Sequence, residues 1–239
     1  MTETMERVQT YQQFIDGQWV DSASGETLAV ENPATGQVIA RIQASGEEDV
    51  NRAAEAAHQA FEDGWRHTTP QDRSLMLLRL ADRIEANADE LGRLEAQNAG
   101  KPVQAAIDEM SAVVDNLRFF AGAARVMEGK AANEYLAGHL SMIRRDPVGV
   151  VASIAPWNYP LYMAGWKIGP ALAAGNTVIL KPSARTPLTS VKLMELAGDI
   201  FPPGVLNVIT GTGDAIGTSL VAHPRVAQAD VWVDDEHRP

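Results

Sequence analysis

Residues 148–181 read VGVVASIAPWNYPLYMAGWKIGPALAAGNTVILK, and this stretch decides the fold class. It contains two continuous apolar runs, at 148–154 and 177–180, which predict β-strands covered on both faces. The segment between them, 161–174, has the length of a helix, and Gly175 is a typical residue for the end of one. A strand, a helix and a second strand in this order predict a parallel β-α-β unit.

The same pattern continues on the C-terminal side. Thr186 and Pro187 begin a second segment of helix length, up to about residue 200, and a third apolar run follows at 205–209. The chain therefore predicts an α/β fold with a doubly wound parallel sheet. The sheet is expected to be incomplete, with three clear strands and at most a degraded fourth around 226–233. An uncovered sheet edge exposes apolar surface, so we expect the chain to self-associate or oligomerise.

The N-terminal half predicts β segments first and helices afterwards. Residues 14–20 and 28–42 favour strands, with turns at Asp16-Gly17 and within ENPATGQ at 31–37. Three helices are then predicted from start signals followed by apolar residues at helical spacing. Their expected bounds are 45–61, with a capping box of Ser45 and Glu48; 70–98, with Thr69 as cap and Pro70 in the first turn; and 102–126, starting at Pro102.

Composition excludes several classes of function. The 239 residues carry 20 Lys and Arg against 31 Asp and Glu, a net charge of −11 without a basic cluster, which disfavours nucleic-acid binding. No apolar run is long enough to span a membrane, and the polar start MTETMERVQT is not a secretory signal, so a cytoplasmic location is expected. The sequence has no cysteine, which removes disulfides, thiolate zinc sites and thiol catalysis, and no metal site is expected.

Polar and glycine-rich segments follow each of the three predicted strands. They are APWN at 155–158, KPSA at 181–184 and GTGDAIG at 211–217. Ligands of open α/β sheets bind beyond the carboxyl ends of the strands, where these segments would meet. The glycine segment alone is also compatible with an ordinary turn into a helix. Lys181 is more specific, because an ammonium at the end of a buried strand needs a partner such as a ribose hydroxyl or a phosphate.

Together these segments resemble the aldehyde dehydrogenase superfamily. The resemblance rests on SIAPWNYPLYMAGWKIGPALAAGNTVILKPSARTPL at 153–188, FPPGVLNVITGTGDAIGTSLVAHPRV at 201–226 and ENPATG at 31–36. Within the superfamily, the sequence most resembles the γ-aminobutyraldehyde (1-pyrroline) and betaine aldehyde dehydrogenase branch. It implies a cofactor-binding domain at 1–133 and 147–226, an oligomerisation-type β-hairpin arm at 134–146 and an unmatched acidic tail at 227–239.

The resemblance also implies roles for individual residues. Asn158 corresponds to the donor that stabilises the oxyanion formed from the aldehyde. Lys167 corresponds to a lysine described as part of a charge relay, although a helix lysine paired with a carboxylate is equally compatible. Tyr159 and Trp166 correspond to aromatics that box a cationic substrate, with core packing as the alternative. The implied cofactor-binding residues are Ile154, Ala155, Pro156, Trp157, Lys181, Ser183, Ala184, Gly211, Gly213 and Gly217.

Two departures from the family pattern limit what the resemblance implies. Where the family usually has a glutamate that binds the ribose hydroxyls of NAD, this chain has Ala184 followed by Arg185, so NADP is a possible cofactor besides NAD. The region of the nucleophilic cysteine and the general-base glutamate is absent. The expected function is thus that of a truncated NAD(P)-dependent aldehyde dehydrogenase that at most binds nucleotide. The alternatives are an assembly fragment that pairs with a full-length subunit and an unstable, frameshifted product.

Overall fold

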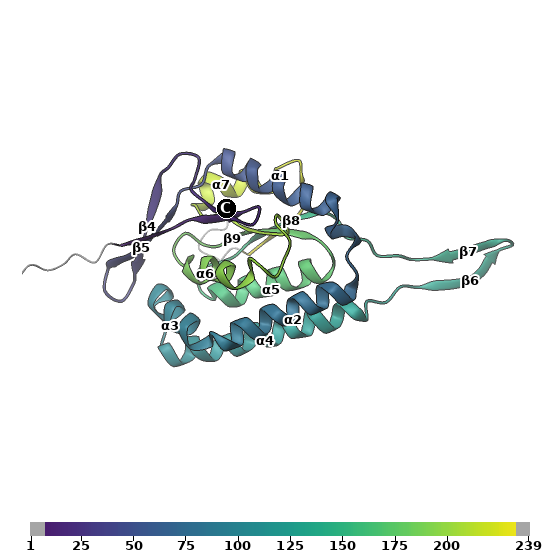
Figure 1. Cartoon of the computed structure of the whole chain (residues 1–239), viewed down its shortest axis with the longest axis horizontal. Helices are drawn as coiled ribbons and strands as arrows, with labels where there is room; N and C mark the ends of the chain where they lie inside the picture. Colours follow the sequence, from purple (N-terminus) through teal and green to yellow (C-terminus); the bar gives the residue numbers. More distant parts are fainter. Residues whose placement is uncertain (1–7, 233–239) are drawn as a thin grey trace, which may run out of the picture.

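The computed structural model describes residues 8–232 and shows an α/β fold around one six-stranded sheet (Figure 1). The strand order is β11-β8-β9-β10-β2-β3. The three predicted parallel strands are confirmed as β8 (Val150–Ile154), β9 (Thr177–Lys181) and β10 (Leu206–Val208), connected by α5 (Pro160–Ala173) and α6 (Leu188–Ala197). The helix α7 (Gly213–Val221) then leads to β11.

Both edges of the sheet differ from the sequence prediction. β11 (Val226–Val231) pairs in parallel with β8 along its length, so the fourth strand is formed and residues 227–231 are part of the sheet rather than of a separate tail. The family resemblance ended at 226 because no family motif is matched beyond it. The strand itself is hard to predict because β11 is largely exposed and lacks a continuous apolar run. The remainder of the predicted tail, 233–239, lies outside the described residues.

The opposite edge is covered by the N-terminal hairpin of β2 (Gln13–Ile15) and β3 (Gln18–Val20). Its turn at Asp16-Gly17 has positive φ angles of 54° and 74°, as the sequence predicted. β2 pairs antiparallel with β10 through Phe14 and Val208, so the sheet is mixed and not purely parallel. The sequence did not predict this pairing, because it joins segments far apart in the chain.

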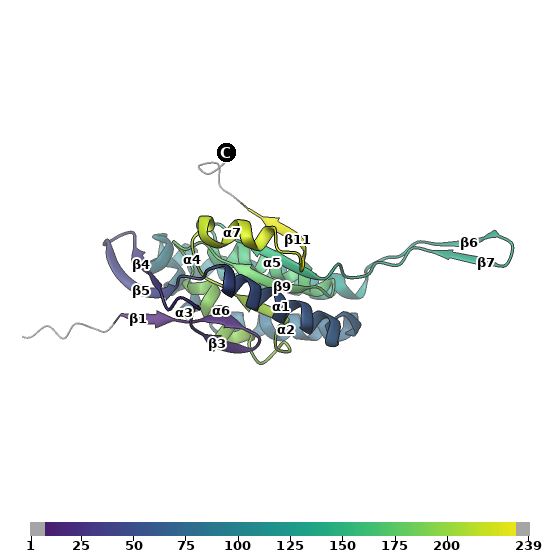
Figure 2. The same ribbon diagram turned by 90° about the horizontal axis from the view of Figure 1, so that it is seen from above.

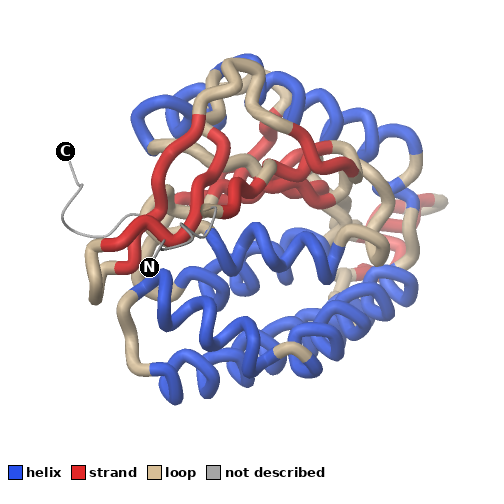
Figure 3. The backbone as a smooth tube through the Cα atoms, turned by 60° about the vertical axis from the view of Figure 1, so that its left-hand side comes forward, coloured by secondary structure: helices blue, strands red, loops and turns tan. Residues whose placement is uncertain are grey.

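Helices cover both faces of the sheet. On one face, α1 (Glu47–Asp63) and α7 pack on a cluster that includes Val150, Ala152 and Ile179. On the other face, α5 and α6 pack on Val178 and Leu180, and α2 (Pro70–Ala86), α3 (Ala88–Ala99) and α4 (Val103–Arg125) form an outer layer beyond them (Figures 1 and 3). Successive residues of β9 therefore face opposite cores, as expected for a strand buried on both sides.

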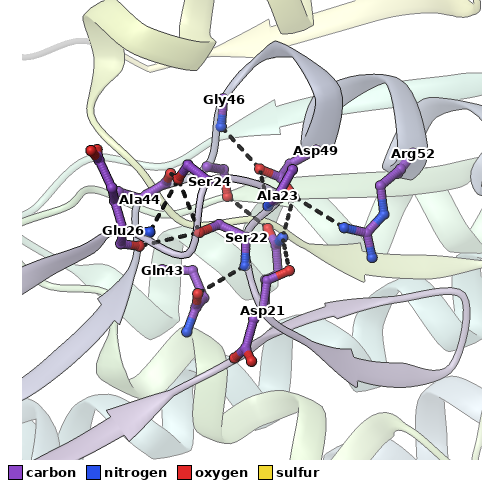
Figure 4. A network of polar contacts seen from close by, with 12 residues as sticks. Asp21, Ser22, Ala23, Ser24, Glu26, Gln43, Ala44, Gly46, Asp49 and Arg52 are labelled. Atoms are coloured by element: carbon purple, nitrogen blue, oxygen red, sulfur yellow. Dashed lines mark hydrogen bonds and ion pairs between the residues drawn. The ribbon is translucent and has the colours of Figure 1, made fainter.

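Two helix boundaries correct the sequence prediction. The first helix begins after Gly46 rather than Ser45, and the Asp49 carboxylate accepts a hydrogen bond from the Gly46 N–H at 3.0 Å (Figure 4). Ser45 is instead used in the core, where its hydroxyl donates to Gln13. The single helix expected at 70–98 is split into α2 and α3 at Asn87. The cap of α2 is as predicted, with the Thr69 hydroxyl accepting from the Asp72 N–H.

Two further β elements stand apart from the main sheet. β4 (Thr27–Asn32) and β5 (Gln37–Gln43) form a hairpin around the ENPATGQ turn, and β1 (Gln9–Tyr11) joins β5. β6 (Ala131–Leu136) and β7 (His139–Met142) form the predicted arm, which projects far from the body of the molecule (Figure 2). The arm begins a few residues earlier than the expected 134–146.

Candidate functional site

The carboxyl ends of three neighbouring strands lie side by side. The strand register aligns Val231 of β11, Ile154 of β8 and Lys181 of β9 at these ends. The chain leaves β8 toward the face covered by α5 but reaches β11 from α7 on the other face. The strand order therefore reverses between β8 and β11, and ligands of open α/β sheets bind at such a switch point.

A cavity of about 810 Å³ opens at this point, within the size range of ligand sites, roughly 300–1,000 Å³. It brings together most of the cofactor-binding residues expected from the sequence. These are Ile154, Ala155, Pro156, Trp157, Lys181, Ser183, Ala184, Gly213 and Gly217. We refer to this cavity as the switch-point cleft.

The first turns of α7 leave room for a ligand along one side of the cleft. Gly213 and Gly217 are four residues apart, and a Cβ added at either would meet no atom within 4 Å. Thr212 caps the helix, its hydroxyl accepting from the Ala215 N–H at 3.3 Å. A ligand can thus approach the helix backbone closely, at the end where unpaired N–H groups favour negative charge.

Gly211 has a different role from the other two glycines. It does not line the switch-point cleft, and a Cβ there would lie 3.0 Å from Ile216 Cδ1 and 3.3 Å from the Ser45 carbonyl oxygen. A side chain at this position would therefore crowd the contact between α7 and the segment that precedes α1. The structure gives Gly211 a place behind the cleft and not within it.

Lys181 is the buried cation of the cleft. Its residue is only 3% exposed, and burial lowers the pKa of its ammonium from 10.5 to about 8. The Nζ atom donates to the carbonyl oxygen of Pro182 at 3.2 Å, and within residues 8–232 it forms no ion pair with a carboxylate. The ammonium is therefore under-compensated, which is the state expected of a group that receives a partner from a ligand.

The loop after β9 forms another wall of the cleft. The Ser183 hydroxyl accepts from the Arg185 N–H at 3.3 Å, which shapes the turn that carries Ala184. Arg185 is exposed and lines the cleft. A second cavity of about 520 Å³ shares Trp157, Ala184, Arg185 and Thr212 with the cleft and extends toward β4. A bound ligand would therefore meet a cationic side chain beside a small one.

Asn158 lies on the exposed turn between β8 and α5. Its side-chain oxygen accepts a hydrogen bond from the N–H of Tyr159 at 3.1 Å. With the oxygen engaged by the backbone, the orientation of the carboxamide is set so that its NH₂ group is the end left to act as a donor. Asn158 is not among the residues that line the cleft, but Trp157, the residue directly before it, does line the cleft.

The predicted aromatic pair is part of a group of three. Tyr162 lies between Tyr159 and Trp166, with ring centroids 6.5 Å and 5.3 Å from theirs, so it connects residues that do not stack directly. Tyr159 is 47% exposed and Trp166 is 48% exposed, so neither belongs to the buried core of residues 8–232. The ammonium of Lys101 lies over the Tyr159 ring at 4.7 Å. One aromatic face is therefore already in contact with a cation.

Lys167 is buried in α5 and reaches across to β11. Its Nζ lies 2.8 Å from the Asp230 carboxylate and 3.3 Å from the Asp230 carbonyl oxygen. The Lys167 side chain is 2% exposed, whereas that of Asp230 is 50% exposed. This geometry matches the carboxylate-paired interpretation of the lysine, since the ion pair holds the edge strand against the helix.

Sequence reasoning did not assign seven residues that line the cleft, most of them apolar or hydroxyl-bearing and one of them acidic. The missed residues are Thr212, Asp214, Thr218, Val221, Ala222, Val231 and Trp232. Helical spacing from Gly213 and Gly217 points to Val221 on the same face of α7, so the glycine pattern contained a signal for it. Val231 and Trp232 gave no such signal, because they enter the site only through the pairing of β11 with β8.

Among the residues that the structure describes, no group of three His, Cys, Asp or Glu side chains is arranged to hold a metal ion. No helix within 8–232 is both long and apolar enough to cross a membrane.

Comparison with known proteins agrees with the geometry. Residues 19–230 match the family described as "Aldehyde dehydrogenase family". The chain therefore belongs to the aldehyde dehydrogenase family, as the sequence motifs had predicted. The match runs through most of β11, which extends the similarity beyond the 226 expected from the sequence.

Two curated relatives are 42% and 46% identical to this chain over most of its length. Phenylacetaldehyde dehydrogenase of Pseudomonas fluorescens is 46% identical over 226 residues, which cover 91% of this chain and 45% of that protein. Aldehyde dehydrogenase B of Escherichia coli K12 is 42% identical over 222 residues, covering 91% and 42% respectively. The chain thus spans less than half the length of the curated relatives it matches.

Solved structures of the family share the fold. Betaine aldehyde dehydrogenase from Staphylococcus aureus in complex with NAD+ is 38% identical, with a TM-score of 0.90 over 92% of this chain and 44% of that one. The NAD+ complex of aldehyde dehydrogenase from Bacillus cereus is 39% identical, with a TM-score of 0.89 over 92% and 45%.

Proposed function

We propose that this chain is the nucleotide-binding part of an NAD(P)-dependent aldehyde dehydrogenase and that the switch-point cleft holds the nucleotide. One observation carries this proposal. The buried ammonium of Lys181 lines a cleft, and along the α7 side of that cleft Gly213 and Gly217 leave the helix backbone open to a ligand. A dinucleotide requires close approach to a helix start and polar groups for its ribose and phosphates, and the cleft offers both. NAD+ in two related solved structures supports the same assignment.

Different residues of the cleft would contact different parts of the nucleotide. Lys181 and Ser183 would bind ribose hydroxyls, and the open face at Gly213 and Gly217 would lie against the adenosine and pyrophosphate. The strand end from Ile154 to Trp157 would lie along the nicotinamide half. Bound there, the nicotinamide supplies the acceptor for a hydride from the aldehyde carbon.

The preference between NAD and NADP depends on the loop after β9. Ala184 offers no carboxylate to repel a 2′-phosphate, and the exposed Arg185 adds positive charge to the same wall. We propose that NADP is accepted as well as NAD. Replacing Ala184 with glutamate should weaken NADP binding more than NAD binding, measured by titration calorimetry of each nucleotide. Equal effects on both would contradict a role of this loop in cofactor choice.

The residue proposed to act on the aldehyde lies on the turn after β8. Asn158 would donate a hydrogen bond from its carboxamide to the aldehyde oxygen as negative charge develops there. The exposed aromatic group at Tyr159 and Trp166 would form one side of the aldehyde pocket. The 239 residues contain no cysteine, so no thiol of this sequence can form the covalent adduct. We therefore propose nucleotide binding without aldehyde oxidation by this chain alone.

Titration with NAD and NADP tests the proposal directly. Calorimetry should show one site whose affinity falls at least about tenfold in Lys181→Met and in Gly217→Leu. The purified chain incubated with NAD and betaine aldehyde or phenylacetaldehyde should form no NADH. Absence of nucleotide binding would refute the first part. NADH formation at a rate typical of enzymes, about 1 per second or faster, would refute the second.

A second candidate function is assembly with another copy or with a longer family member. It is favoured by the arm of β6 and β7, whose residues Leu136, Leu140 and Met142 are 60%, 71% and 62% exposed. Apolar side chains on a projecting hairpin favour association. Sedimentation should show oligomers that dissociate when Leu140 and Met142 are replaced with serine. A monomer in the unmodified chain would remove this candidate.

A further inference from the structure

Two buried polar side chains of α3 form hydrogen bonds with the segments of the chain that follow β8 and β9. Glu95 is 0% exposed and Asn98 is 3% exposed, and they are one helical turn apart. Neither belongs to the strand ends, and Glu95 does not line either cavity of the site. Buried polar groups of this kind are kept where their hydrogen bonds fix the surrounding backbone.

Glu95 connects the starts of two helices that follow neighbouring strands. Its Oε2 accepts a hydrogen bond from the Leu161 N–H of α5 at 3.2 Å and from the Thr189 hydroxyl of α6 at 2.6 Å. One carboxylate oxygen therefore fixes both helices at the ends from which the cleft loops emerge. Leu161 follows Asn158 and Trp157 by only a few residues.

Asn98 holds the loop after β9 at two points. Its Nδ2 donates to the Arg185 carbonyl oxygen at 3.0 Å, and its Oδ1 accepts from the Leu188 N–H at 3.1 Å. The loops after β8 and β9 are also joined directly, because the Thr186 hydroxyl donates to the Trp157 carbonyl oxygen at 3.0 Å. The two loops and α3 thus form one hydrogen-bonded unit.

The charge of Glu95 is only partly balanced. Its Oε1 has no hydrogen-bond partner within the part of the chain that the structure describes, and Lys101 lies 3.6 Å away while forming a closer pair with Glu109 at 2.6 Å. Burial raises the pKa of Glu95. A buried carboxylate that is poorly compensated costs stability.

We propose that Glu95 and Asn98 are positioning residues that pre-organise the two loops of the switch-point cleft for nucleotide binding. The proposal rests on the proposed binding of nucleotide at that cleft. A loop that samples other conformations lowers the apparent affinity in proportion to the time it spends away from the binding geometry. Fixing both loops from α3 removes this loss without any contact between α3's carboxylate and the ligand.

Four variants separate positioning from general stability. Glu95→Ala removes the acceptor for Leu161 and Thr189, whereas Glu95→Gln keeps an oxygen for both bonds. Asp49→Ala is the matched control, because Asp49 is also 0% exposed and accepts bonds from Ala23 and Gly46 (Figure 4) and from Gln13, all of which lie outside the segments that follow β8 and β9. Asn98→Ala serves as an independent second variant should Glu95→Ala fail to fold.

NAD affinity is measured by calorimetry in the whole chain, and amide hydrogen exchange of peptides covering 156–161 and 183–189 is measured without nucleotide. Glu95→Ala and Asn98→Ala should weaken NAD binding about tenfold and speed exchange in both peptides. Glu95→Gln should restore both properties, and Asp49→Ala should change neither, even if its melting temperature falls equally.

Equal weakening in Asp49→Ala and Glu95→Ala would overturn the proposal, since loss of stability alone would then explain it. Unchanged exchange in Glu95→Ala would overturn it as well. If the unmodified chain binds no NAD, the proposed function fails, yet the exchange experiment still decides whether α3 positions the two loops. Faster exchange confined to those loops would then support positioning by itself.

Discussion

Replacing Lys181 with methionine should make the protein more stable while weakening the proposed nucleotide site. Methionine is unbranched and fills a similar channel without a charge. The pKa of Lys181 falls from 10.5 to about 8 through burial. Each pKa unit corresponds to about 1.4 kcal/mol, so burying the charged ammonium costs about 3 kcal/mol at neutral pH. Lys181→Met should raise the free energy of unfolding by up to about that amount at pH 7.

The pH dependence gives the prediction a second signature. Below pH 8 the ammonium is charged in both the folded and unfolded states, and the full cost of burial is present. Between pH 8 and 10.5 the folded state releases its proton while the unfolded state retains it, so the wild-type protein gains stability as the pH rises. The advantage of Lys181→Met should therefore shrink across this interval and vanish above it.

Urea denaturation followed by circular dichroism at pH 7 and at pH 9.5 measures both effects. In parallel, NAD affinity should fall roughly 10- to 100-fold in the variant, the loss expected for one charge-assisted hydrogen bond. A Lys181→Met protein that is no more stable than wild type at pH 7 would refute the burial argument. A gain in stability that does not depend on pH would show that packing, and not charge, is responsible.

Three other changes test separate parts of the structure. Gly217→Leu places its side chain in open space, so the melting temperature should not fall, whereas calorimetry should detect at least about tenfold weaker NAD binding. Asp230→Ala leaves the buried Lys167 ammonium without its carboxylate. The free energy of unfolding in urea should fall by roughly 1–3 kcal/mol, a range kept low because Asp230 is half exposed. Asp230→Asn should recover part of that loss. Trp65→Phe removes the indole N–H that donates to the Asn176 carbonyl oxygen at 2.8 Å and should cost about 1–3 kcal/mol in the same assay; an unchanged midpoint would mean that this bond adds nothing.

Local sequence patterns predicted the centre of the sheet but not its edges. β8 and β9 are buried on both faces, so their apolar runs are visible in the sequence. β11 lies at an edge and is mostly exposed, and its assignment depends on hydrogen bonds to β8 rather than on its own residues. β2 pairs with β10 through Phe14 and Val208, and no local pattern reports such a distant pairing.

The site was predictable to the extent that its residues follow strands or interrupt helices with glycine. Lys181 is a charged residue at the end of an apolar run, and Gly213 and Gly217 are small residues at helical spacing in a segment that otherwise favours a helix. Ala184 belongs to a segment that follows a predicted strand, whereas its bearing on cofactor choice, and that of Arg185, came only from the family resemblance. Val231 and Trp232 are ordinary apolar residues, and only the arrangement of the strands reveals that they line the cleft.

Glu95 is a carboxylate on an otherwise apolar helix face, and such a residue carries information about its surroundings. In LGRLEAQN, Glu95 and Asn98 follow Leu91 by four and seven residues and therefore lie on the same buried face of α3. A carboxylate on an otherwise apolar helix face must be compensated by nearby donors. Backbone N–H groups at a helix start are such donors, so a buried acid of this kind indicates that another helix begins against it. In this chain that helix is α5, and the turn leading into it carries Trp157 and Asn158.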